Sequence, residues 1–206
     1  LMSWSGSMFE YLMPPLVMKE PQGSILNQTS KLIIKRQIQY ARSKNVPWGI
    51  SEAAYNARDR ELTYQYTNFG VPGLGLKRGL GQNTVIAPYA TILAAQFSPR
   101  EAVQNLQRLR SIGALGRHGF YDAVDFTPQR VPEGTDHAVV QNYMAHHSGM
   151  SIAAVADAIF EGRLRERFHS DPVIESAELL LQEKAPRDIP TATVRTEADE
   201  RSKDET

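Results

Sequence analysis

The carboxylate best placed for acid–base chemistry is Glu52, which lies between Trp48 and Tyr55 in residues 47–56. A carboxyl group held against aromatic rings loses hydration, which disfavours its charged form and suits it to proton donation near neutral pH. Aromatic rings beside a carboxyl group also suit a sugar site, because the CH faces of sugars pack on rings while their hydroxyls take hydrogen bonds. The alternative is a Glu that only caps its own helix, with Trp48 in the core.

Two further carboxylates repeat this pattern at distant points of the chain. Glu10 precedes Tyr11, and Asp122 follows Tyr121. Two carboxylates across one glycosidic bond, one protonated and one ionised, are the minimum machinery for glycoside cleavage or transfer. The alternatives are that Glu10 is a buried ion-pair partner and that Asp122 caps a short turn.

Aromatic and histidine side chains near these carboxylates are predicted to bind the substrate. The candidates are Trp4, Tyr11, Trp48, Tyr55, Tyr64, Tyr66, Tyr121, His146 and His147. Adjacent residues on a helix point about 100° apart, so we expect that His146 and His147 cannot share one metal ion, and no third zinc ligand is evident. One of the two is expected to hydrogen-bond a sugar hydroxyl or a catalytic carboxylate, or to be a satisfied core histidine. We predict no metal and no cofactor.

Composition excludes several other classes of protein. Among the 206 residues, 23 Lys and Arg balance 23 Asp and Glu, so no charge excess favours a nucleic acid partner. No Cys is present, which rules out disulfides and thiolate metal sites. The glycines of residues 70–81 do not form a phosphate loop, because Lys77 is followed by Arg78 rather than by Ser or Thr.

The elements that position these residues are predicted to be helices. Ser24, Ser51 and Ser98 are suitable N-caps, and Pro99 with Glu101 completes a capping box after Ser98. Pro88 is tolerable only in the first turn of its helix. Gly149 is expected to divide the helix that contains the two histidines. The predicted helices span residues 24–43, 52–58, 84–97, 98–112, 136–160 and 171–183.

No convincing run of alternating strand residues appears, so the predicted fold class is all-α. Residues 1–170 are predicted to form one domain, and residues 171–206 a helix followed by a Pro-, Thr- and charge-rich linker or disordered tail. The longest apolar stretch, residues 85–97, is shorter than the roughly 20 residues of a membrane-spanning helix. No signal peptide is predicted. A start at Leu1 within an aromatic-rich segment suggests a piece of a longer protein, truncated at its N-terminus.

Six blocks, in this order, resemble the glucoamylase-like domain of bacterial cyclic β-1,2-glucan synthases, to which domains of endo-β-1,2-glucanases are related. The blocks are WSGSMFEYLMP (4–14), PWGISEAAYN (47–56), YQYTNFGVPGLGLKRGL (64–80), VIAPYAT (85–91), GRHGFYDAVDFTP (116–128) and YMAHHSGMS (143–151). The resemblance spans about residues 1–170, and residues 168–188 also resemble the linker that precedes the phosphorylase-like domain of those synthases.

This resemblance implies a partial (α/α)6 toroid that holds only the later helix pairs. It implies a retaining transglycosylation that closes linear β-1,2-glucan into a ring, with two alternatives, an endo-hydrolase and a catalytically weakened glucan-binding module. It also implies that the chain is part of a multi-domain protein of the bacterial inner membrane, in which a separate domain uses UDP-glucose. The domain formed by this chain is then expected to be soluble and on the cytoplasmic side. The implied partners are β-1,2-glucan, the missing upstream helices and the neighbouring synthase domains.

The resemblance carries over to the three carboxylates position by position. Glu10 and Glu52 match acidic positions of the family in type, whereas Asp122 stands where Glu is expected and Ser148 where Gln is expected. We predict Glu52 as proton donor, Asp122 as its partner, and Glu10 as the group that orients a sugar or keeps Glu52 protonated. Which carboxylate is the acid and which the nucleophile stays open.

Overall fold

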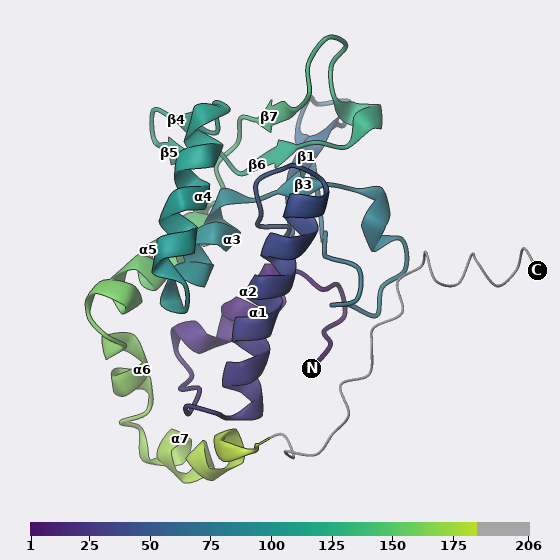
Figure 1. Cartoon of the computed structure of the whole chain (residues 1–206). Coiled ribbons are helices and arrows are strands. Elements are labelled where there is room, and N and C mark those ends of the chain that lie inside the picture. Colours follow the sequence, from purple (N-terminus) through teal and green to yellow (C-terminus); the bar gives the residue numbers. More distant parts are fainter. Residues whose placement is uncertain (185–206) are drawn as a thin grey trace, which may run out of the picture.

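The computed structural model describes residues 1–184, in which helices and short strands alternate along the chain (Figure 1). The α-helices are α1 (Met8–Leu12), α2 (Ile25–Ser43), α3 (Pro88–Leu93), α4 (Pro99–Ser111), α5 (Ala145–Ile159), α6 (Arg163–Phe168) and α7 (Pro172–Ala177). The 3₁₀ helices are η1 (Pro14–Leu16), η2 (Leu80–Gln82), η3 (Ala94–Gln96), η4 (Pro128–Arg130) and η5 (Glu178–Gln182). Among the described residues, no helix has both the length and the apolar character needed to cross a membrane.

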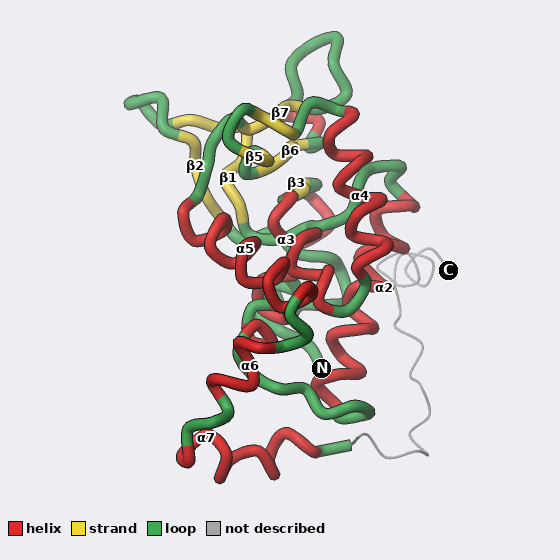
Figure 2. The backbone as a smooth tube through the Cα atoms, turned by 90° about the vertical axis from the view of Figure 1, so that its left-hand side faces the viewer, coloured by secondary structure: helices red, strands yellow, loops and turns green. Residues whose placement is uncertain are grey.

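The strands form three small antiparallel sheets near one end of the molecule (Figure 2). In the first, β1 pairs with β2; in the second, β6 lies between β3 and β7; in the third, β4 pairs with β5. The strands are β1 (Ala53–Arg58), β2 (Tyr64–Thr67), β3 (Val85–Ile86), β4 (Leu115–Gly116), β5 (Gly119–Phe120), β6 (Ala123–Asp125) and β7 (Ala138–Val140). The predicted all-α class is therefore corrected to a helix-rich fold with strands.

The helix predicted over residues 52–58 is wrong, because this segment is strand β1. Ser51 caps no helix; its hydroxyl accepts a hydrogen bond from the Phe9 backbone N–H at 3.0 Å. The strand is held by β2 on one side and by side-chain carboxylates on the other, since Ala54 donates its N–H to Asp122 at 2.7 Å. Pairing with segments far along the chain thus overrides a local sequence that suits a helix.

Two other predicted helices are shorter than expected, because β-branched residues at their starts pair into the β3–β6–β7 sheet. Val85 lies opposite Asp125, and Val140 lies opposite Ala123. Helix α3 then begins at Pro88, in the first-turn position predicted for this proline. Helix α5 begins only at Ala145 and runs without a break through Gly149, so the predicted break there is wrong.

Several helix boundaries are confirmed. Ser24 caps α2, and its hydroxyl accepts a hydrogen bond from the Asn27 backbone N–H at 3.2 Å. Helix α4 begins with Pro99 directly after Ser98, although the Ser98 side chain makes no capping bond. Asp171 caps α7, which ends at Ala177 and continues as η5. The predicted disordered tail lies, from residue 185 onward, outside the described residues.

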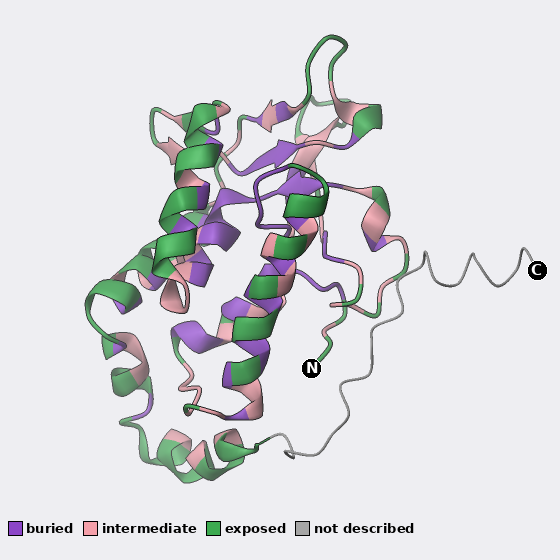
Figure 3. Ribbon diagram, viewed as in Figure 1, coloured by how far each residue is buried: buried purple, intermediate pink, exposed green. Residues whose placement is uncertain are grey.

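The core is centred on α3, whose residues are almost all buried between α1, α4 and α5 (Figure 3). Its Tyr89 and Leu93 are joined by Met8 and Leu12 of α1 and by Ile86 of β3. Since α3 follows β3 directly, this buried helix fixes the β3–β6–β7 sheet relative to α5. The candidate site forms at this junction of sheet and helices.

Candidate functional site

Five side chains from four parts of the chain meet where α5 begins, and we call them the Glu52 cluster. Glu52 directly precedes β1, Tyr66 lies on β2, and Asp122 lies between β5 and β6. His146 and His147 belong to the first turn of α5. Glu52 and Asp122 are connected through Tyr66 and His147, and His146 contacts Tyr66 beside this path.

The hydroxyl group of Tyr66 lies at the centre of this cluster. It donates a hydrogen bond to Oε1 of Glu52 at 2.7 Å, and its oxygen lies 3.2 Å from Nε2 of His147 and 3.4 Å from Nε2 of His146. Burial, followed by the hydrogen bond to Glu52, raises the pKa of the Tyr66 phenol far above its ordinary value. Tyr66 therefore remains a neutral hydrogen-bonding group at physiological pH.

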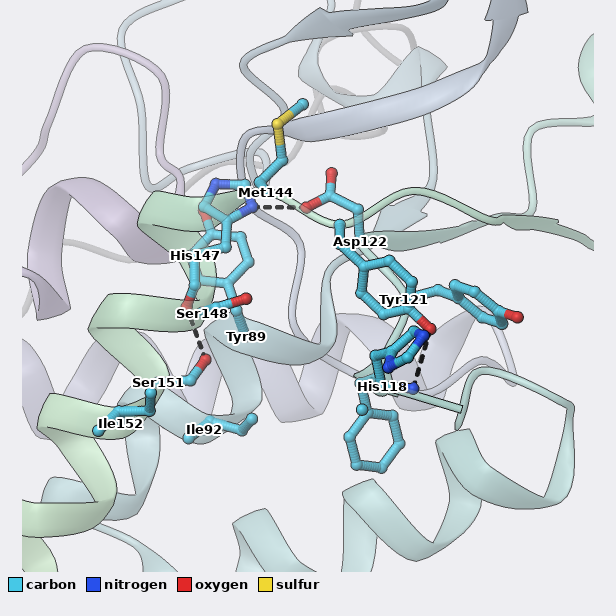
Figure 4. Close-up of a pocket in the computed structure, with 13 residues that line it drawn as sticks. Tyr89, Ile92, His118, Tyr121, Asp122, Met144, His147, Ser148, Ser151 and Ile152 are labelled. Carbon is cyan, nitrogen blue, oxygen red and sulfur yellow. Dashed lines mark hydrogen bonds and ion pairs between the residues drawn. The ribbon is translucent and has the colours of Figure 1, made fainter. Parts of the chain in front are cut away.

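His147 is fixed from two sides. Its Nδ1 lies 2.6 Å from Oδ1 of Asp122, and its ring stacks on Tyr89 at 3.7 Å between centroids with 12° between the planes (Figure 4). The other oxygen of Asp122 accepts the Ala54 N–H at 2.7 Å. With Nδ1 directed to the carboxylate, the Nε2 atom of His147 faces Tyr66 and the remainder of the cluster.

His146 lies beside His147 instead of diverging from it. The two ring centroids are 4.1 Å apart, so the divergence from which we expected that His146 and His147 cannot share one metal ion is not found. Both residues belong to the first turn of α5, where their rings lean together toward Tyr66. Burial, and then the nearby His147, lower the pKa of His146. One carboxylate oxygen of Glu52 and one nitrogen of each ring lie within 4.8 Å of one another, a donor set that could hold a metal ion.

A cavity of about 310 Å³ opens beside the cluster, between α3, α5 and the β5–β6 region (Figure 4). Tyr121 and Tyr143 form an aromatic wall with ring centroids 5.2 Å apart, close to the backbone of Gly116. Such rings can take the apolar face of a sugar, while the polar cluster takes its hydroxyls. The lining residues are Tyr89, Ile92, His118, Gly119, Phe120, Tyr121, Asp122, Tyr143, Met144, His147, Ser148, Ser151 and Ile152.

Glu10 lies apart from this cavity and organises the N-terminal segment. Its carboxylate accepts hydrogen bonds from the Ser3 hydroxyl at 2.6 Å and from the Ser5 N–H at 3.0 Å. Burial works to raise the pKa of Glu10, but the hydrogen bonds from Ser3 and Ser5 outweigh it, and the pKa is lowered. The Tyr11 hydroxyl donates to the Leu74 carbonyl at 2.6 Å, a structural contact, and Trp4 is exposed on the surface.

The remaining predicted aromatic residues also lie outside the cavity. Trp48 is buried, and its carbonyl accepts hydrogen bonds from Thr91 and Asn105, which matches the core alternative. The Tyr64 hydroxyl accepts a hydrogen bond from Arg58 at 2.7 Å. Tyr55 lies below the guanidinium of Arg130, at 4.9 Å, in the wall of a second cavity.

Sequence reasoning missed two aromatic residues of the site. Tyr89 supports the His147 ring, and its hydroxyl donates to the backbone carbonyl of Glu52 at 2.9 Å. Tyr143 completes the aromatic wall with Tyr121. Tyr89 lies in block 85–91 and Tyr143 in block 143–151, so their positions in the six quoted blocks could have identified them as site residues.

Comparison with known proteins defines the class. A family model described as "putative glucoamylase" matches residues 1–172, and the chain therefore belongs to this family.

Two individual proteins that are similar to the chain give more specific information than the family model does. Over 197 residues the chain is 70% identical to the cyclic β-(1,2)-glucan synthase NdvB of Rhizobium meliloti (strain 1021), an alignment that covers 96% of the chain and 7% of that protein. The resemblance found in the six blocks is confirmed. The fold is similar to that of an endo-β-1,2-glucanase from Chitinophaga pinensis, solved with sophorotriose and glucose. That match has a TM-score of 0.57 and 18% identity, and it covers 89% of this chain and 42% of the glucanase.

Proposed function

We propose that this chain forms part of a β-1,2-glucan-processing site in a larger synthase, where linear glucan is cut and rejoined to itself as a ring. The observation that carries the proposal is the hydrogen-bonded path from Glu52 through Tyr66 and His147 to Asp122, beside an aromatic cavity. The 70% identity to a protein named as a cyclic glucan synthase supports the substrate and the product. The chain spans 7% of that relative, so the remaining machinery belongs to other parts of the parent.

In this proposal Glu52 is the catalytic carboxylate and acts first as the proton donor. Its side chain is partly exposed, which leaves a face open to a sugar, while Tyr66 holds Oε1. When Glu52 carries the proton, it donates to the Tyr66 oxygen, and Tyr66 in turn donates to Nε2 of His147. In either protonation state Glu52 keeps its hydrogen bond to the Tyr66 hydroxyl, as a group that acts as acid and then as base requires.

In this proposal Asp122 has a role other than that of the catalytic partner of Glu52. Its side chain is fully enclosed, and its two oxygens are engaged by His147 and the Ala54 N–H. A carboxylate so engaged cannot approach an anomeric carbon, so we assign Asp122 as the positioning residue of His147. We propose that the second carboxylate of a retaining reaction comes from another part of the parent.

Tyr121 and Tyr143 form the sugar platform in this proposal. Their rings are the exposed aromatic surface of the cavity that Asp122 and His147 also line. The helix-rich fold and its similarity to the glucanase support a partial (α/α)6 toroid that holds the later helix pairs. We propose that the parent resides in the bacterial inner membrane, with this domain on the cytoplasmic side.

The test replaces Glu52 by Gln in the protein that contains this chain, because Gln keeps the shape and removes the titratable proton. Supplied with linear β-1,2-glucan, the Glu52→Gln variant should lose ring formation by about 10²-fold or more. A ring is one water lighter than the linear chain, so product mass separates cyclisation from hydrolysis.

The matched control is Glu61→Gln in the exposed β1–β2 loop, which should retain ring formation. Unchanged ring formation by Glu52→Gln would refute the assignment. Linear fragments as the sole product of the unmodified protein would replace cyclisation by the endo-hydrolase alternative.

A further inference from the structure

We propose that the Glu52 cluster binds one divalent transition-metal ion of the zinc class. The ligands are a carboxylate oxygen of Glu52 and one ring nitrogen each from His146 and His147, three atoms that lie within 4.8 Å of one another. This inference concerns metal binding by the cluster, and it stands whether or not the chain acts on a glucan.

The donor set matches the chemistry of this class of ion. Imidazole nitrogen and carboxylate oxygen are typical zinc ligands, with bond lengths of about 2.0–2.2 Å, whereas Mg²⁺ prefers oxygen ligands alone. Closure around an ion requires the three atoms to draw together by roughly an ångström. His146 is exposed and Glu52 is partly exposed, so both can move toward His147, which is fixed.

The surroundings of His147 are those of a metal ligand. Zinc-bound histidines characteristically donate their second ring N–H to a carboxylate, which fixes the tautomer and directs the other nitrogen to the metal. Here Nδ1 of His147 lies 2.6 Å from Asp122, and the Asp122 carboxylate is itself held by the Ala54 N–H at 2.7 Å. The side chains of His147 and Asp122 are 4% and 0% exposed, so this support is built into the fold.

With Glu52 ionised and His147 neutral, the cluster has one proton too few for its short contacts. The single hydroxyl proton of Tyr66 is donated to Glu52, so the 3.2 Å contact between the Tyr66 oxygen and Nε2 of a neutral His147 has no proton. Placing the Tyr66 proton on His147 instead leaves the 2.7 Å contact with an ionised Glu52 without one. A proton added to Glu52 completes these contacts, and a metal ion bound to the three outer atoms in place of the Tyr66 hydroxyl replaces them.

Tyr66 occupies the position that the ion would take. Its oxygen lies 2.7, 3.2 and 3.4 Å from the three ligand groups, and its side chain is exposed enough to swing outward. Metal binding therefore displaces the Tyr66 hydroxyl, and Tyr66→Phe removes the competing group. The proposal predicts that this variant binds metal more tightly than the unmodified chain, an effect that general surface binding by histidines would not produce.

The experiment is calorimetric titration of the 206-residue chain with Zn²⁺ alone near neutral pH, and with Mg²⁺ for comparison. We expect one Zn²⁺ per chain, no Mg²⁺ binding, and weaker Zn²⁺ binding as the pH falls, because the histidines must be neutral to ligate. His146→Ala should lose at least about 10-fold in affinity, and Asp122→Asn about 10–100-fold.

The matched control is His118→Ala, which removes another exposed histidine and should leave the affinity unchanged. Circular dichroism verifies that each variant is folded, and His146 is exposed, so its replacement removes no core contact. Absence of Zn²⁺ binding would overturn the proposal. So would equal affinities of His146→Ala and the unmodified chain, because the ion would then bind elsewhere.

Discussion

His147 and Asp122, 25 residues apart in the sequence, are joined through Nδ1 and Oδ1 at 2.6 Å, and their side chains are almost completely enclosed. A buried carboxylate beside a histidine fixes which ring nitrogen carries the proton. Because Nε2 then faces Tyr66, this buried pair determines the hydrogen bonding of the exposed half of the Glu52 cluster. In the proposed site Asp122 therefore acts through His147.

Asp122→Asn should impair the site by changing the tautomer of His147. An amide cannot stabilise the same ring protonation, and the analogous change in a Ser-His-Asp triad costs about 10⁴-fold in turnover. We expect glucan turnover to fall by about 10²-fold or more, and the ¹⁵N chemical shifts of the His147 ring to report the altered tautomer. Asp136→Asn is the matched control, since Asp136 also contacts a histidine, His137, but is exposed. An unaltered His147 tautomer would contradict this role for Asp122.

Gly116→Ala should displace the aromatic wall while the fold remains. A Cβ atom at position 116 would lie 2.5 Å from the ring of Tyr121 and 2.5 Å from the hydroxyl of Tyr143, so both side chains must move away. Because the outer parts of side chains can shift, we expect the melting temperature to change little. Affinity for a β-1,2-linked oligosaccharide should fall by roughly 10-fold, the equivalent of about 1.4 kcal/mol, as titration calorimetry would measure. Unchanged affinity would remove Tyr121 and Tyr143 from the sugar platform.

Gly149→Ala should have the opposite effect and stabilise the chain. Gly149 lies inside α5, is exposed, and has no atom within 4 Å of the position that a Cβ would take. Glycine in a helix interior is less favourable than alanine by roughly 0.5–1 kcal/mol. Urea denaturation should therefore give a free energy of unfolding that is higher by about this amount. A lower value would indicate that α5 requires a flexible position there.

Glu20→Gln should change how stability depends on pH. Burial raises the pKa of Glu20 above 4.5, a shift that Ser30 and then the charges of Arg165 and Lys31 only partly offset. A raised folded-state pKa means that the folded state binds the proton more tightly than the unfolded state. Stability is therefore lost as the pH rises through this range.

The measurement compares the free energies of unfolding of Glu20→Gln and the unmodified chain at about pH 4 and about pH 7. The variant should gain stability relative to the unmodified chain at the higher pH, because it cannot ionise. Glu61→Gln, on the exposed β1–β2 loop, should show no such gain. A pH-independent difference for Glu20→Gln would contradict the role given to burial.

The sequence predicted best the features that local chemistry determines. Ser24 and Asp171 cap helices, and Pro88 and Pro99 occupy first turns, because each of these preferences depends on neighbouring residues alone. The six blocks also located the residues of the cluster, since Glu52, Tyr66, Asp122, His146 and His147 all lie within them.

The features that depend on distant partners could not be predicted from local pattern. Residues 53–58 suit a helix, yet they form β1 because Tyr66 and its neighbours on β2 pair with them and because Asp122 binds the Ala54 N–H. A long-range contact also explains the arrangement of Asp122, whose partner His147 lies 25 residues further along the chain, so the expected contact of a histidine with a carboxylate could not be assigned to this pair. Glu10 differs, because Ser3 and Ser5, which bind it, are only 7 and 5 residues away in the sequence.

A crystal structure of Glu52→Gln with a linear β-1,2-linked oligosaccharide tests most directly whether a glucan binds with its reacting bond at Glu52. The prediction is a glycosidic oxygen about 2.6–3.2 Å from the side chain at position 52, with a sugar ring on Tyr121 or Tyr143. An oligosaccharide bound only in the second cavity, between Tyr55 and Arg130, would contradict this prediction.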